Sequence, residues 1–183
     1  MIEFREFLTE KMGYSKACAM LAVSHDVQEM VYSLQNLHIP TEVLADSGYQ
    51  RDVHITLAYG FSDDQFSDAV YALHKLNWSQ VVYRLENKLS KFEASDYDVI
   101  KIGVRSENKS ELQKVHEVLA TLANDPSEYS FENYNPHMTV AYVKKGSCDH
   151  LLDQPICSIC DLFFGMERVI WSDTKGKLRA ILP

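Results

Sequence analysis

The amino-acid sequence predicts a mixed α+β protein with a single domain, and three observations support this prediction. Segments typical of strands alternate with segments whose apolar residues recur at helical spacing. Two strand-like segments, nearly half the chain apart, carry the same pattern of residue types. The length of 183 residues and the apolar share of 46% suit one domain with a substantial core. No run of about 18 apolar residues occurs, so we expect no membrane-spanning helix.

Strands are expected where β-branched, aromatic and other apolar residues are concentrated. Five internal segments meet this description: residues 16–24, 54–61, 81–94, 98–105 and 137–144. The end of the chain reads as a long hairpin, with strands at 160–172 and 177–182 around a turn at Asp173–Gly176. Residues 40–52 and the loop after Ala123 are expected to be irregular.

Helices are expected where apolar residues recur three and four positions apart, which holds for residues 26–37, 63–76 and 108–123. In the first helix the apolar positions are Val27, Met30, Val31 and Leu34. Asp26 is its candidate N-cap, and Ser62 is the expected cap of the second helix.

The charge balance limits the class of partner. Lys and Arg total 18 against 26 Asp and Glu, a formal net charge of −8. Phosphate binding along a nucleic acid depends mostly on basic charge, so long DNA or RNA is not expected as the main partner. The charge balance does not exclude a ligand of one or a few nucleotides held in a local pocket. The N-terminus lacks an apolar run with a cleavage site, so we expect a cytosolic protein, in the host cytosol if the source is a virus.

A zinc site is the first alternative that the sequence raises. Cys148, His150, Cys157 and Cys160 resemble a compressed zinc pattern. Residues 156–164 read better as a buried strand, on which Cys157 and Cys160 would point to opposite faces. We therefore expect no metal site and treat the cysteines as reduced, buried thiols.

The most informative feature is an internal repeat. His54-Ile-Thr-Leu-Ala-Tyr59 is matched by His137-Met-Thr-Val-Ala-Tyr142, so the order His, apolar, Thr, apolar, Ala, Tyr occurs twice. Side chains two apart on a regular strand share a face. His54 therefore lies beside Thr56, and His137 lies beside Thr139. Tyr59 and Tyr142, at an odd offset from the histidines, are expected to face away into the core.

Two imidazoles and two hydroxyls that converge on one point suit the cleavage of a phosphodiester. One histidine accepts the proton of the attacking oxygen, and the other donates a proton to the leaving oxygen. The hydroxyls of Thr56 and Thr139 stabilise the charge that builds on the phosphate oxygens. This scheme needs no metal, no cofactor and no protein nucleophile. The residues do not indicate which histidine is the base.

The pair of His-x-Thr motifs resembles the 2H phosphoesterase superfamily, which includes 2′-5′ RNA ligase-like proteins, cyclic phosphodiesterases and viral phosphodiesterases. The resemblance implies one domain over residues 1–183, made of two pseudo-symmetric lobes. In such a fold two antiparallel sheets face a central cleft, with helices outside. It also implies a metal-independent phosphodiesterase whose catalytic residues are His54, Thr56, His137 and Thr139.

The substrate class is open at this stage. The chain is similar to the viral anti-CBASS nucleases, which hydrolyse the cyclic oligonucleotide messengers of bacterial immunity, so we expect a cyclic di- or trinucleotide. An RNA-processing 2′,3′-cyclic phosphodiesterase or a 2′-5′ RNA ligase-like enzyme acting on RNA ends is the first alternative. A nucleotide-binding sponge without turnover is the second, although intact motifs argue against it.

Base recognition needs aromatic planes and a few polar groups near the motifs. The candidates for substrate binding are Tyr14, Lys16, Tyr134, Glu167 and Trp171. The histidines without a threonine two residues on are expected on the surface or on helices: His25, His38, His74, His116 and His150.

Overall fold

A computed structural model describes residues 16–76, 82–106, 110–123, 134–156, 164–165 and 168–182. Four residues singled out in the sequence lie outside this part of the chain: Tyr14, Cys157, Cys160 and Glu167.

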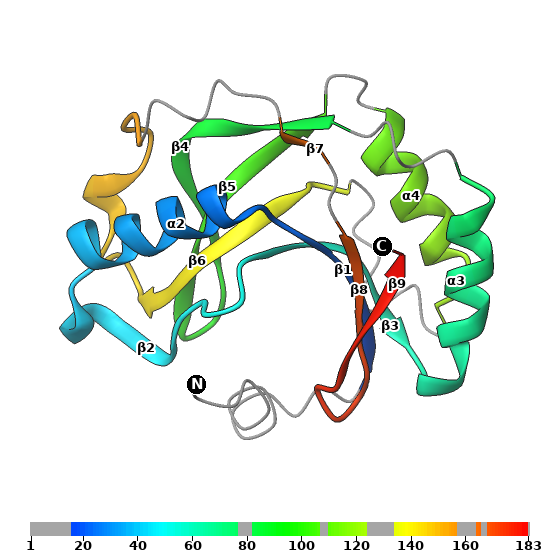
Figure 1. Cartoon of the computed structure of the whole chain (residues 1–183). Helices are drawn as coiled ribbons and strands as arrows, with labels where there is room; N and C mark the ends of the chain where they lie inside the picture. Colours follow the sequence, from blue (N-terminus) through cyan, green and yellow to red (C-terminus); the bar gives the residue numbers. More distant parts are fainter. Residues whose placement is uncertain are drawn as a thin grey trace.

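The described strands form one curled sheet (Figure 1). Its strands are β1 (Ala17–Ala22), β2 (Leu44–Tyr49), β3 (His54–Phe61), β4 (Val82–Glu93), β5 (Tyr97–Ser106), β6 (His137–Lys144), β7 (Phe164–Gly165), β8 (Arg168–Ser172) and β9 (Leu178–Leu182). The strand order is β7-β4-β5-β6-β3-β1-β8-β9, and β2 also pairs with β6. All of these pairings are antiparallel, which confirms the predicted α+β class.

The sheet has two halves that meet at one point. Strands β3 and β6 pair only where Ile55 faces Met138. On one side of this junction lie β3, β1, β8 and β9, which we call the β3 half. On the other side lie β6, β5, β4 and β7, with β2, which we call the β6 half. The two sheets expected from the sequence are therefore joined into one sheet at this pair.

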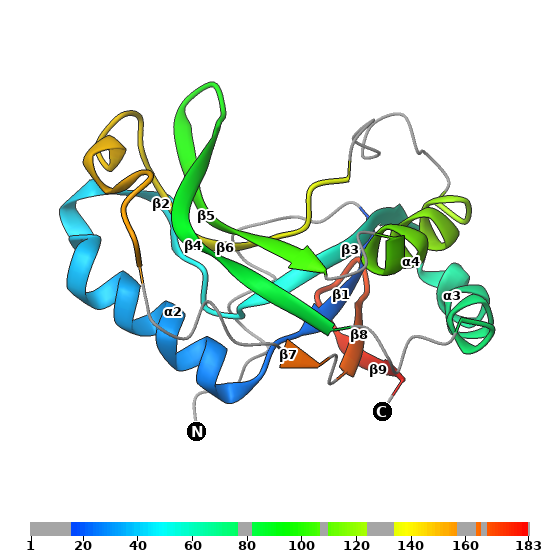
Figure 2. The same cartoon turned by 90° about the horizontal axis from the view of Figure 1, so that it is seen from above.

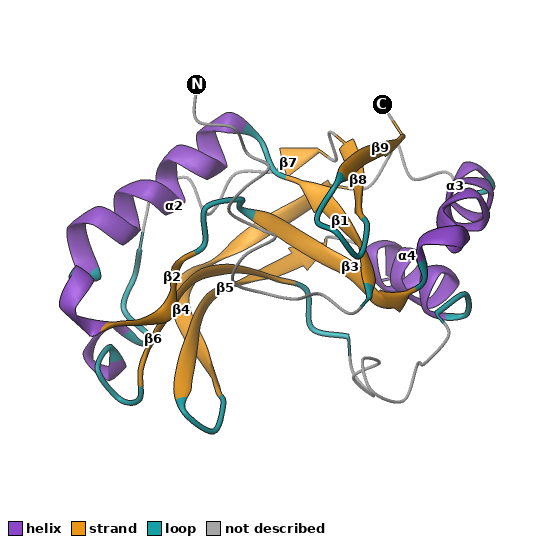
Figure 3. Ribbon diagram, turned by 90° about the horizontal axis from the view of Figure 1, so that it is seen from below, coloured by secondary structure: helices purple, strands orange, loops and turns teal. Residues whose placement is uncertain are grey.

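Three described helices cover the two ends of the sheet: α2 (His25–His38), α3 (Phe66–His74) and α4 (Ser110–Ala120). Figure 1 and Figure 3 show α2 beside the β6 half, and α3 and α4 beside the β3 half. Helix α2 follows β1 in the chain but packs on β6, and α4 follows β5 but packs on β3. Each half of the sheet is therefore covered, at least in part, by a helix that follows a strand of the other half. None of the described helices is long and apolar enough to cross a membrane.

The helix starts match the sequence in part. Ser62 and Gln65 form a capping box, as expected of Ser62, but a single 3₁₀ turn precedes α3. The cap of α2 is Ser24, whose hydroxyl accepts a hydrogen bond from the Val27 N–H at 3.4 Å. The prediction of Asp26 as the cap was wrong. Asp26 lies in the first turn, where its charge favours the positive end of the helix dipole.

Strand β2 lies in the segment that we expected to be irregular. Asp46, Ser47 and Gly48 are poor strand formers, and Gly48 has a positive φ of 66°. The strand nevertheless pairs with β6 at Leu44 and Tyr49. The free edge of β6, which the local sequence does not reveal, provides the partner that makes this segment a strand.

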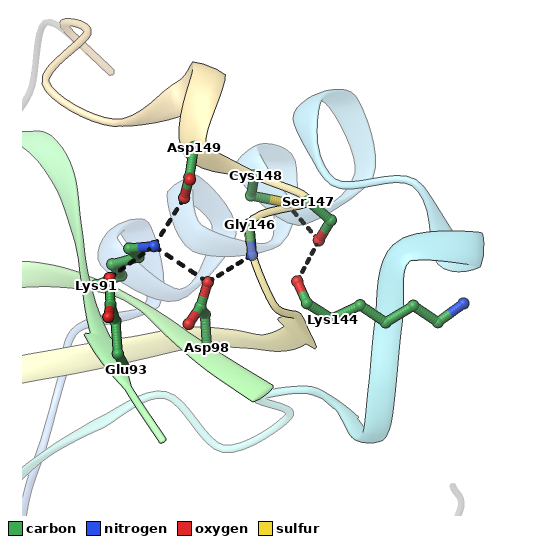
Figure 4. A network of polar contacts seen from close by, with 8 residues as sticks. All are labelled: Lys91, Glu93, Asp98, Lys144, Gly146, Ser147, Cys148 and Asp149. Atoms are coloured by element: carbon green, nitrogen blue, oxygen red, sulfur yellow. Dashed lines mark hydrogen bonds and ion pairs between the residues drawn. The ribbon is translucent and has the colours of Figure 1, made fainter. Parts of the chain in front are cut away.

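A polar network joins the β4–β5 hairpin to the turn after β6 (Figure 4). The ammonium of Lys91 donates to Asp149 at 2.8 Å and to Asp98 at 3.3 Å, and it lies 3.0 Å from Glu93. The backbone N–H of Gly146 donates to the same Asp98 oxygen at 2.8 Å. Figure 2 shows this hairpin standing out from the rest of the sheet, so the network anchors a projecting element.

Candidate active site

The first His-x-Thr motif lies on β3, which contains an extra residue directly after the threonine. Thr56 faces Met20 of β1, whereas Ala58 faces Ala19. Leu57 is skipped in this register, which is the mark of a β-bulge. Leu57 and Ala58 are both buried as a result.

The second motif, on β6, contains the same irregularity at the equivalent place. Thr139 faces Lys101 of β5, whereas Ala141 faces Ile100. Val140 is skipped, and both Val140 and Ala141 are fully buried. The internal repeat thus extends from residue types to backbone geometry.

The bulges reverse the expected orientation of the two tyrosines. Because the bulge adds one residue, a side chain at an odd offset beyond it points to the same face as the motif histidine. Tyr59 and Tyr142 are accordingly half-buried, like the motif residues, and Tyr142 forms a side-chain hydrogen bond with Thr139. The expectation that they face away from the histidines into the core was wrong, because alternation was assumed to continue through the bulge.

Each bulge leaves a carbonyl that a helix side chain binds. The Leu57 carbonyl is contacted by His116 Nδ1 of α4 at 2.7 Å. The Val140 carbonyl accepts hydrogen bonds from Gln35 Nε2 of α2 at 2.8 Å and from the Gln50 N–H at 3.0 Å. His116 and Gln35 are 9% and 5% exposed, so these bonds explain two polar side chains in the core.

Both motif histidines are held in the same way. His54 Nδ1 lies 2.6 Å from the carbonyl oxygen of Asp52, and His137 Nδ1 lies 2.9 Å from that of Asn135. A carbonyl oxygen only accepts hydrogen bonds, so Nδ1 carries the proton in each ring. Nε2 is left as the proton-exchanging nitrogen of each half-buried imidazole.

The junction of the two halves brings the motifs together. An antiparallel register continued from the Ile55–Met138 pair sets His54 across from Thr139, and Thr56 across from His137, on the face opposite to those core residues. Burial lowers the pKa of His54, and the charge of His137 lowers it further. The two imidazoles are therefore close enough to interact.

The surroundings of His137 contain three groups that sequence reasoning missed. The Phe92 ring meets the imidazole edge to face, with centroids 4.9 Å apart. Lys101 Nζ lies 4.2 Å from the centre of the same Phe92 ring. Glu86 lies against Gly103, the partner of His137 on β5, and fills the space that a side chain there would need. Lys101 could have indicated these surroundings from the sequence, because it is a lysine within the apolar run of β5.

The pKa of His137 is lowered, like that of His54. Burial is the main cause, the carbonyl of Asn135 opposes it, and the charge of Lys101 adds to it. Both rings thus favour the neutral form more than a free histidine does, and an imidazole in this form can accept a proton at Nε2.

Of the predicted substrate-binding residues, Tyr134 lies beside the first motif, whereas Lys16 lies far from it. The Tyr134 hydroxyl donates to the Thr56 carbonyl at 2.9 Å, and its ring stacks on His116 with centroids 4.1 Å apart. Tyr134 is therefore next to the first motif, with one ring face covered. Lys16 precedes the end of β1 that pairs with Phe61, far along the strand from His54.

Trp171 is a correction to the sequence prediction. It is fully buried, and its ring packs on Phe61 and Phe66 with centroids 4.9 and 5.8 Å apart. No ring face is available to stack on a base. The residue lies on β8, inside the β3 half, where a large aromatic side chain fills the core.

The described residues contain no group of three or more His, Cys, Asp or Glu side chains placed to hold a metal. Within the same part of the chain, Cys18 and Cys148 are buried free thiols. Burial raises the pKa of Cys18 to about 12, although a hydrogen bond with the Thr56 hydroxyl, which acts as the donor to the sulfur, lowers it. Cys18 is thus a neutral thiol beside the first motif.

Comparison with known proteins identifies the family. The model of the 2′-5′ RNA ligase superfamily matches residues 23–154, a segment that contains both motifs. A search of the curated proteins finds no match.

Solved structures share the fold at low sequence identity. The apo form of Escherichia coli LigT is 14% identical, with a TM-score of 0.61 over 90% of this chain and 92% of that chain. Kluyveromyces marxianus Usb1 with uridine monophosphate is 9% identical, with a TM-score of 0.62 over 94% and 100%. The family model matches most of the chain, and the solved structure of LigT shares the fold of this chain. The chain therefore belongs to the 2′-5′ RNA ligase superfamily of 2H phosphoesterases and is an enzyme of the phosphodiesterase type.

Proposed function

We propose that this protein cleaves phosphodiester bonds of small nucleotides by paired acid–base catalysis at His54 and His137. The observation that carries the proposal is the equivalent Nδ1–H bond of each imidazole to a carbonyl two residues upstream. This bond aligns both rings and leaves both Nε2 atoms to exchange protons with a substrate.

The reaction follows from that arrangement. The substrate's 2′-hydroxyl loses its proton to Nε2 of one histidine as its oxygen bonds to phosphorus. The bond from phosphorus to the leaving oxygen breaks, and that oxygen takes the proton from Nε2 of the other histidine. The products are a cyclic phosphate end and a free hydroxyl. The Thr56 and Thr139 hydroxyls donate to the non-bridging oxygens as negative charge grows.

The substrate that we propose is a cyclic oligonucleotide messenger of bacterial immunity, cleaved by a viral protein of the anti-CBASS type. The net charge of −8 favours a small substrate held by local groups. Among the proteins of the same fold, LigT has been solved with 3′-AMP and Usb1 with uridine monophosphate. Tyr134, beside the first motif, is our candidate for contact with a base, and Tyr14, Lys16 and Glu167 stay as predictions.

The family name favours a second candidate. The matching model describes a 2′-5′ RNA ligase superfamily, so an RNA-processing enzyme that opens 2′,3′-cyclic phosphates or acts on 2′-5′ RNA ends is the alternative. A sponge that binds cyclic nucleotides without turnover would not need both histidines and both threonines.

A substrate panel tests these options. The protein is incubated with cyclic dinucleotides, cyclic trinucleotides, RNA with a 2′,3′-cyclic phosphate end and 2′-5′-linked RNA, and products are separated by chromatography. We expect cleavage of a cyclic oligonucleotide by the wild type in EDTA and none by a His54→Ala/His137→Ala double variant. Turnover of RNA ends alone supports the alternative. Binding without conversion of any substrate contradicts the proposal and favours the sponge.

A further inference from the structure

The strands beside the two motifs occupy equivalent positions but carry different side chains. Met20 of β1 faces Thr56, and Lys101 of β5 faces Thr139, in each case next to the bulge. Two residues further along, Ala22 faces His54 and Gly103 faces His137. The two halves thus have the same register, but a thioether lies beside one threonine and an ammonium beside the other.

Lys101 is an unusual cation for such a position. Lys101 is 5% exposed, and its ammonium lies over the ring of Phe92. Among the described residues, no carboxylate forms an ion pair with it. Burial lowers its pKa, whereas the nearby Glu86 raises it. A lysine that is largely removed from water and has no ion pair carries a desolvation cost that a bound anion would offset.

We infer that Lys101 binds a non-bridging oxygen of the scissile phosphate together with Thr139. This inference rests on the proposed function. Cross-strand partners on one face are neighbours, so the ammonium and the Thr139 hydroxyl approach the same phosphate oxygens. The corresponding position in the β3 half has only Met20 and offers no charge.

Lys101 also lies close enough to His137 to affect the charge of that imidazole. The charged groups near His137 are Lys101 from β5, Glu86 from β4 and His54 from β3; Arg105 of β5 is bonded to Glu86 at 2.8 Å. The ammonium of Lys101 disfavours a second positive charge on His137. Removal of Lys101 should therefore make His137 easier to protonate.

The test is the Lys101→Met variant, with Lys88→Met as its matched control. Both changes remove one positive charge, but Lys88 is an exposed residue of β4 that pairs with Asp153 at 2.9 Å. We expect Lys101→Met to lower kcat by about 10²-fold, as the loss of one preorganised donor does. We also expect the limb of its kcat/KM–pH profile that reports His137 to move to higher pH, because His137 becomes easier to protonate. Lys88→Met changes neither quantity, and Lys101→Arg keeps the limb in place.

One outcome would overturn the inference. An unchanged rate and profile in Lys101→Met would show that Lys101 does not act on the phosphate. Melting curves of Lys101→Met and Lys101→Arg check that both variants fold.

A substrate-free measurement separates this inference from the proposed function. NMR titration of the His137 ring, assigned with a His137→Asn variant, reports its pKa in the wild type and in Lys101→Met. We expect the pKa to rise in the variant and inorganic phosphate to bind more weakly than in Lys88→Met. If the wild type converts no substrate while these effects appear, the proposed function fails and the Lys101 site stands. If neither effect appears, the Lys101 site fails.

Discussion

The β3 half and the β6 half of the sheet repeat the same geometry with different neighbours. Both motifs have a bulge after the threonine and a histidine held by a carbonyl two residues upstream. The bulge carbonyl is bound by His116 in one half and by Gln35 in the other. The residues that face the threonines are Met20 and Lys101. The comparison indicates that backbone geometry presents each motif, while the flanking strand determines whether a charged side chain lies beside it.

The largest expected effect comes from removing either imidazole. We expect His54→Ala and His137→Ala each to lower kcat by about 10²- to 10⁴-fold, because each removes one positioned proton transfer. We expect only a small change in the free energy of unfolding, because both rings are half-buried. Steady-state kinetics and thermal unfolding of the two variants check this. Full activity in either single variant would show that the halves do not act as a pair.

The threonines should differ from each other. Removing the hydroxyl in Thr56→Val is expected to cost about 10- to 100-fold in kcat/KM, which corresponds to one hydrogen bond to a charged group. Thr139→Val should cost less, because Lys101 remains beside the same phosphate oxygens. Kinetics of the two variants under one set of conditions measure the ratio. Equal losses, or a greater loss in Thr139→Val, would contradict the asymmetry of the two halves.

The bulges can be tested through the helix side chains that bind them. His116→Leu and Gln35→Leu each leave a buried carbonyl with a lost donor, so we expect each to lower the free energy of unfolding by about 2 kcal/mol. In Gln35→Leu the Gln50 N–H still binds the Val140 carbonyl, but the Gln50 carbonyl also loses the Gln35 donor. Urea denaturation of both variants gives the comparison. No loss in His116→Leu would mean that the β3 bulge does not depend on α4.

The smallest effect concerns acid stability. Asp98 in the β6 half is 1% exposed, and the N–H of Gly146, with Lys91, holds its pKa below the usual range. Asp63, beside the β3 half, is exposed, and Thr174 lowers its pKa in a similar way. A lowered folded pKa adds stability above the unfolded pKa, and that stability is lost as pH falls through the folded pKa.

We therefore expect Asp98→Asn to lower the free energy of unfolding at pH 7 by about 1.5 kcal/mol and to flatten its decline in acid. Asp63→Asn should have a smaller effect, because water screens an exposed group. Urea denaturation between pH 7 and pH 3 measures both. A pH dependence unchanged in Asp98→Asn would show that this carboxylate does not contribute to acid unfolding.

Local patterns of the sequence were sufficient for the elements that carry the motifs. The bounds of β3 and β6 agree with the predicted strands, since apolar and polar residues alternate from His54 to Leu57 and from His137 to Val140. The repeat itself also indicated the family, because two His-x-Thr motifs with matching flanks rarely arise by chance.

Tertiary structure decided everything that depends on a strand's neighbours. A bulge exists only relative to a partner strand, so alternation placed Tyr59 and Tyr142 on the wrong face. Trp171 looked available for stacking, but packing against Phe61 and Phe66 buries it. Strand β2 forms because β6 offers an edge.

The sequence by itself determined two histidine–threonine pairs and the strands that hold them, and it suggested the proton-transfer chemistry that we propose. It could not show that one pair lies beside a buried lysine, because Lys101 reaches Thr139 and His137 only through the register of β5 on β6. Periodicity is a property of one segment of chain, whereas register and burial are properties of the assembled sheet. The difference between the two halves is therefore a product of the tertiary fold.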